Sequence, residues 1–146
     1  MLRAMRRPRP RGAPARFGEA PSLDDLLGLA EAARAGLPPP FAARAAEVRL
    51  LVEDWPDEAT LDDLGIEDAY DLTGLYDGVP LTERSVTDPP LEPGTVWLFR
   101  RPLLDEWADR GDVTLEALVA HVVVHELAHH FGWSDDDIAA IDRWWE

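Results

Sequence analysis

The chain lacks cysteine and lysine, and its only methionines are Met1 and Met5. Without thiols it can form neither disulfides nor a thiolate metal site. No apolar run reaches the roughly eighteen residues that a membrane helix needs, so the sequence predicts no transmembrane segment. Arg6-Arg7 precedes no apolar stretch, which argues against a Sec-like or twin-arginine signal. We therefore expect a cytoplasmic protein.

Charge is distributed very unevenly along the chain. Six of the 14 arginines lie in the first sixteen positions, whereas all 29 acidic residues follow Phe17. The remaining eight arginines against 29 acids leave residues 17–146 with a net charge of −21. A surface of this sign repels nucleic acid and anionic membranes, so we expect neither as a partner.

The length of 146 residues fits one domain with a real core. Residues 1–21 are rich in arginine, proline, glycine and alanine, and contain too few large apolar residues to offset the entropy of ordering. The sequence therefore predicts a flexible Arg/Pro-rich tail over residues 1–21 and a single domain over residues 22–146.

Periodicity and punctuation predict a mixture of helices and short strands, which indicates an α+β fold. Ser22 is a predicted helix cap and Gly36 a predicted helix end. Residues 71–88, punctuated by Gly74, Gly78 and Pro80, read as a loop. Strands are expected over 48–54 and 95–100, and helices over 22–36, 41–47, 57–64, 103–110 and 115–131, with a last helix carrying Ile138, Ile141 and Trp145.

The stretch from His125 to Asp135 carries the chemistry. On a helix, His125 and His129 are one turn apart and can share a metal ion. Glu126 is placed to take a proton from a metal-bound water. Gly132 ends the helix, and Asp135 follows closely enough to offer a carboxylate oxygen. Two imidazoles, one carboxylate and a water would form a catalytic zinc site with one open position.

Several alternatives stay open. The histidines of a buried helix can instead be core residues bonded to carbonyls. Asp135 also reads as part of a helix start after Ser134. His121, one turn before His125, is either a substitute third ligand or a half-buried histidine bonded to a carbonyl. His130 is expected to point away from the metal, near the ligands or at the surface.

Three stretches together resemble the small minimal zincin-like metallopeptidases. These are Leu75-Tyr76-Asp77-Gly78-Val79-Pro80-Leu81-Thr82-Glu83-Arg84, the strand ending in Phe99-Arg100-Arg101-Pro102, and Val123 to Gly132, with the metzincin-like pattern HExxHxxGxxD reaching Asp135. The resemblance implies a zincin-like fold with a small mixed sheet packed against a central metal-binding helix. It implies His125, His129 and Asp135 as ligands of Zn²⁺ and Glu126 as the general base. A methionine turn after the third ligand is absent, as in the minimal family.

The expected function is zinc-dependent hydrolysis of peptide bonds in a peptide or protein substrate, through a water activated by Glu126. The alternative is a domain that binds zinc for structure, or binds a partner, without significant peptidase activity. Iron, nickel or cobalt would also suit these ligands. Tyr76 either helps to bind an oxyanion or simply packs in the core. Glu83 and Arg84 are candidates for orienting the ligands.

Overall fold

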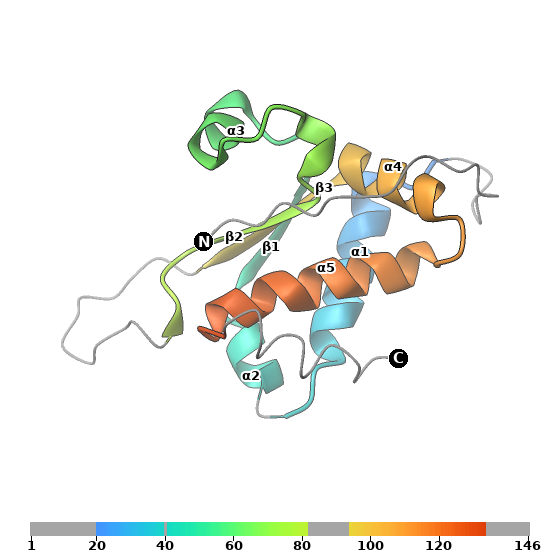
Figure 1. Cartoon of the computed structure of the whole chain (residues 1–146). Coiled ribbons are helices and arrows are strands. Elements are labelled where there is room, and N and C mark those ends of the chain that lie inside the picture. The colour runs from blue at the N-terminus through green and yellow to red at the C-terminus, as the bar shows by residue number, and fades with distance from the viewer. Residues whose placement is uncertain (1–19, 40, 82–93, 134–146) are drawn as a thin grey trace.

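The computed structural model describes residues 20–39, 41–81 and 94–133, and it confirms the α+β class (Figure 1). The predicted helices and strands in this part of the chain form close to their expected bounds. In chain order the elements are α1 (Leu23–Ala35), α2 (Phe41–Ala45), β1 (Arg49–Glu53), α3 (Glu58–Leu64), the 3₁₀ helix η1 (Ala69–Asp71), β2 (Gly74–Asp77), β3 (Thr95–Phe99), α4 (Arg100–Arg110) and α5 (Leu115–His130).

The three strands form one mixed sheet in the order β1-β3-β2. β1 runs parallel to β3, with Leu50 opposite Val96. β2 runs antiparallel to β3, with Tyr76 opposite the same Val96. β3 is therefore the central strand, and β2 is an edge strand of this sheet.

The two faces of the sheet carry different layers because successive side chains point to opposite sides. Tyr76, Val96 and Leu98 join the main core with α1 and α5, and in Figure 1 these two helices lie beside the sheet. Leu75 and Phe99 instead join a smaller cluster with Leu61, Leu64, Ile66, Leu72 and Trp97, to which α3 contributes. The larger core thus lies between the sheet and the long helix α5.

Helix α5 begins and ends where its sequence predicts. The Thr114 side chain accepts a hydrogen bond from the Ala117 N–H at 3.0 Å, which caps the first turn. At the other end Gly132 has a φ of 80°, a left-handed conformation that favours glycine. The N–H groups of Gly132 and Trp133 donate to the carbonyls of His129 and Ala128, both at 3.0 Å. These two hydrogen bonds form a Schellman motif, which confirms the predicted role of Gly132 as the helix end.

The prediction that residues 71–88 form a loop is wrong in its first part, because Gly74–Asp77 is strand β2. Of these four residues only Tyr76 is of a type enriched in strands, and Gly74 and Asp77 are of types depleted there. The segment becomes a strand because it pairs with β3 along its whole length. Tertiary pairing of this kind is not visible in local composition.

Some predictions lie outside the described residues, namely the tail up to residue 19 and the last helix around Ile138. The division of the chain at residues 21 and 22 stays a prediction. Among the described residues, no helix is long and apolar enough to cross a membrane.

Candidate metal centre

His125 and His129 lie on the same side of α5, and their rings meet edge to face. The ring centroids are 5.5 Å apart and the ring planes make an angle of 80°. Two imidazoles that share a zinc ion at about 2.0–2.1 Å from nitrogen, in roughly tetrahedral geometry, place their centroids about 5 Å apart. The observed centroid separation is therefore close to that of two imidazoles that share an ion.

His121 lies one turn earlier on α5 and is placed less well for the same ion. Its ring centroid is 6.1 Å from that of His125, and it is half-buried. A centroid separation of this size requires an angle at the metal well above the tetrahedral value. Between the two histidine pairs, the geometry favours His125 with His129.

Glu126 is fully buried against the edge strand β2. A Cβ atom added at Gly74 would lie 3.5 Å from Cγ of Glu126 and 2.5 Å from Cγ1 of Val122. The second distance is shorter than carbon atoms tolerate, so only glycine lets the strand approach α5 this closely. Gly74 therefore sets the distance between the strand and the carboxylate, a role that sequence reasoning missed when it took this glycine for loop punctuation.

The outer edge of β2 beside Glu126 presents backbone groups. The Phe99 N–H donates to the Thr73 carbonyl at 3.0 Å, just beyond the ladder in which Gly74 stands opposite Leu98. Residues bonded across an antiparallel pair alternate along the strand. Gly74 and Tyr76 therefore direct their N–H and C=O groups away from β3, but both residues are buried, so these groups are not open to solvent.

The structure decides the two alternatives for Tyr76 and corrects the expectation for His130. Tyr76 is fully buried, and its hydroxyl lies 2.8 Å from Nδ1 of His130. It therefore packs in the core rather than facing a substrate carbonyl. His130 is also fully buried, so a surface position is wrong. His130 is buried because β2 packs against α5 at this point. The sequence did not predict β2, and it therefore did not predict this burial.

The third expected ligand, Asp135, and the loop residues Glu83 and Arg84 lie outside the described residues. Within the part of the chain that is described, no three histidine, aspartate or glutamate side chains come together as a metal-binding group. Two members of the predicted ligand set are thus seen together, and the completion of the set by Asp135 stays a prediction.

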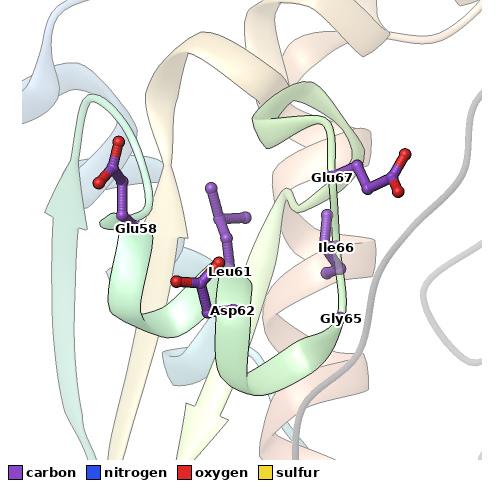
Figure 2. Close-up of a pocket in the computed structure, with 6 residues that line it drawn as sticks. All are labelled: Glu58, Leu61, Asp62, Gly65, Ile66 and Glu67. Atoms are coloured by element: carbon purple, nitrogen blue, oxygen red, sulfur yellow. The ribbon is translucent and has the colours of Figure 1, made fainter.

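Two hollows lie away from these histidines. Figure 2 shows the first, lined by α3 and the segment after it, with Glu58, Leu61, Asp62, Gly65, Ile66 and Glu67. The second, about 420 Å³ in volume, lies on the α3 side of the sheet and includes Trp55, Asp77 and Trp97. No histidine lines either hollow, so neither is the predicted zinc site.

A family model for zincin-like metallopeptidases matches residues 45–145, which is more than half of the chain. The chain belongs to the zincin-like metallopeptidase family. The matched range contains all three strands, both helices α4 and α5, and the positions of His125, Glu126, His129 and Asp135. A search of curated proteins found no match to the chain.

Membership of the zincin-like family confirms the resemblance read from the sequence and agrees with the observed fold. It places the chain among proteins of the peptidase type and connects it with zinc and peptide substrates as a class. The roles of individual residues do not follow from membership of the family.

Proposed function

We propose that this zincin-like protein is a zinc-dependent peptidase that hydrolyses peptide bonds in an extended substrate. The observation that carries the proposal is the facing pair His125 and His129, with the Glu126 carboxylate between them in sequence and against the edge strand in space. This arrangement places two ligands and a base within about one turn of α5.

His125 and His129 would hold the ion, with Asp135 as the third ligand. These nitrogen and oxygen donors suit Zn²⁺, and three protein ligands are typical of catalytic rather than structural sites. When bound, zinc supplies Lewis acidity, which polarises a carbonyl and lowers the pKa of water towards about 7.

The protein's own groups would supply binding and proton transfer. An extended substrate would lie along an edge of the sheet, with its scissile bond beside Glu126. Glu126 would accept a proton from the attacking water and deliver it to the leaving amine. The burial of Glu126 keeps bulk water away from this proton transfer.

The test is digestion of a peptide library by the full chain after chelation and after reloading with zinc. We expect cleavage only in the reloaded protein, and iron, nickel and cobalt reloading would identify any other active metal. Cleavage that survives complete chelation would contradict the proposal.

One observation favours a second candidate, a zinc domain without significant peptidase activity. Glu126 is fully buried and His129 is only 3 % exposed, as expected of a closed structural site. In that case zinc would raise the melting temperature while the peptide library stayed intact. In the peptidase, zinc would both stabilise the fold and restore cleavage.

A further inference from the structure

Tyr76 and His130 connect the edge strand to the last turn of α5. They are 54 positions apart in sequence, and the tyrosine hydroxyl lies 2.8 Å from Nδ1 of the imidazole. Both residues are fully buried. Their rings meet edge to face with centroids 5.6 Å apart. A buried directional contact of this kind fixes the relative position of the two elements that carry it.

The surroundings of the tyrosine hydroxyl leave room for it and little else. A Cβ atom at Gly78 would lie 2.6 Å from this oxygen, and a Cβ atom at Gly94 would lie 2.5 Å from it. Both distances are too short for any larger residue unless the ring moves. The two glycines flank the hydroxyl from the end of β2 and from the residue before β3.

The imidazole also lies near a carboxylate. Nε2 of His130 is 3.8 Å from a carboxylate oxygen of Glu47, a half-exposed residue that follows α2. At this distance the carboxylate does not fix which ring nitrogen carries the hydrogen, so Nδ1 can accept from the tyrosine hydroxyl or donate to it. The Tyr76 hydroxyl also has the Val79 carbonyl as an acceptor, at 3.4 Å.

We propose that Tyr76 and His130 are a positioning pair, which holds edge strand β2 in register with the metal-binding turn of α5. β2 touches α5 at two points, at Gly74 against Val122 and Glu126, and at Tyr76 against His130. His130 directly follows the proposed ligand His129. The pair therefore sets the distance between β2, which also contacts Glu126, and the turn that would hold the metal. This inference rests on the proposed function.

The first test needs neither metal nor activity. Tyr76→Phe keeps the ring and its volume but removes the hydroxyl, and Tyr70→Phe is the matched control in η1. We expect hydrogen exchange of the amides in Gly74–Asp77 to become about tenfold faster in Tyr76→Phe, the effect of one lost hydrogen bond on local opening. The control should leave exchange in β2 unchanged. Unchanged β2 exchange in Tyr76→Phe, or equal acceleration throughout the core, would overturn the pair.

The second test separates positioning from general stability. In Tyr76→Phe we expect KM for a peptide to rise about tenfold with zinc content unchanged, because strand position affects substrate binding before it affects the ligands. The amide in His130→Asn can accept from the hydroxyl or donate to it and should stay close to the wild type, whereas His130→Leu should behave like Tyr76→Phe. Equal KM values in the wild type and Tyr76→Phe, or equal behaviour of the asparagine and leucine variants, would contradict positioning.

The outcomes distinguish this inference from the proposed function. A wild-type chain that binds no zinc and cleaves no peptide would reject the peptidase, while the exchange measurement would still decide whether the pair holds β2. If His130→Leu does not fold, Tyr76→Phe and His130→Asn remain sufficient, since only the first removes the bond.

Discussion

The two faces of the sheet treat polar groups in opposite ways. On the face covered by α5, Glu126, His129 and His130 are buried among apolar residues of the main core. On the side of the small cluster to which α3 contributes, the acidic residues Glu58, Asp62 and Glu67 are exposed around an open hollow (Figure 2). The same sheet therefore separates a buried polar group from a solvated acidic surface.

The difference shows which acidic residues ask for an explanation. Exposed carboxylates keep their hydration, so a cluster of them costs little and indicates no site by itself. Burying the Glu126 carboxylate and the imidazoles of His129 and His130 costs desolvation free energy. Buried polar groups of this kind are typical of functional sites. Acidic residues dominate the composition, yet we expect catalysis from the few buried polar groups on the face that packs against α5.

The largest expected effect comes from replacing the carboxylate of Glu126 by an amide. Glu126→Gln should lower the rate of peptide hydrolysis by about 10²- to 10⁴-fold, the usual contribution of a general base, while zinc content stays unchanged. Glu58→Gln on the exposed face is the matched control and should leave the rate within error. Steady-state kinetics with zinc-loaded protein measures both rates. Equal rates in the two variants would contradict a catalytic role for Glu126.

A smaller effect is expected from a single methyl group between β2 and α5. Gly74→Ala would place Cβ 2.5 Å from Val122 Cγ1, so the strand or the helix must move. Overpacking of a buried contact costs about 1–3 kcal/mol of unfolding free energy. Denaturant titration measures the loss, and a variant as stable as the wild type would mean that β2 does not approach α5 so closely.

The same substitution on an exposed helix surface should act in the other direction. Gly28 is exposed within α1, and a Cβ atom there meets nothing within 4 Å. Gly28→Ala should therefore raise the unfolding free energy by up to about 1 kcal/mol, the difference in helix propensity. The same titration checks it, and destabilisation would contradict an open site at this position.

The smallest effect is expected at the cap of α3. The side chain of Thr60 and then its backbone N–H hold the pKa of Asp57 below its ordinary value of 3.8. A pKa lowered in the folded state means that ionised Asp57 adds stability above the unfolded pKa, and that this part is lost as the pH falls through the folded pKa. Asn caps almost as well, so Asp57→Asn should change stability only slightly at pH 7. The difference in melting temperature between the wild type and Asp57→Asn should shrink as the pH falls from 7 to below 3.8. A difference that grows would contradict the stabilising role of ionised Asp57.

The sequence predicted the elements whose signals are local. Ser22, Thr114 and Gly132 mark helix ends through contacts within one turn, and all three act as expected. The histidine spacing on α5 likewise depends only on helix geometry, so the facing of His125 and His129 could be expected before the structure.

The remaining features depend on contacts between distant segments. β2 forms because it pairs with β3, and neither the closeness of Gly74 to Val122 nor the bond from Tyr76 to His130 has a signature within its own stretch. Glycine at Gly74 was a visible signal, but glycine marks loops more often than it marks a close approach of backbone. The neighbours of the site were therefore harder to predict than its ligands.

The most direct test of the central claim is the amount of metal bound by the purified full chain and by His125→Ala and His129→Ala. If these two imidazoles share an ion, elemental analysis will find one zinc per wild-type chain, and either substitution will remove it, since each leaves too few ligands. A wild-type chain without bound metal after zinc loading, or two variants that both retain a full equivalent, would contradict the account.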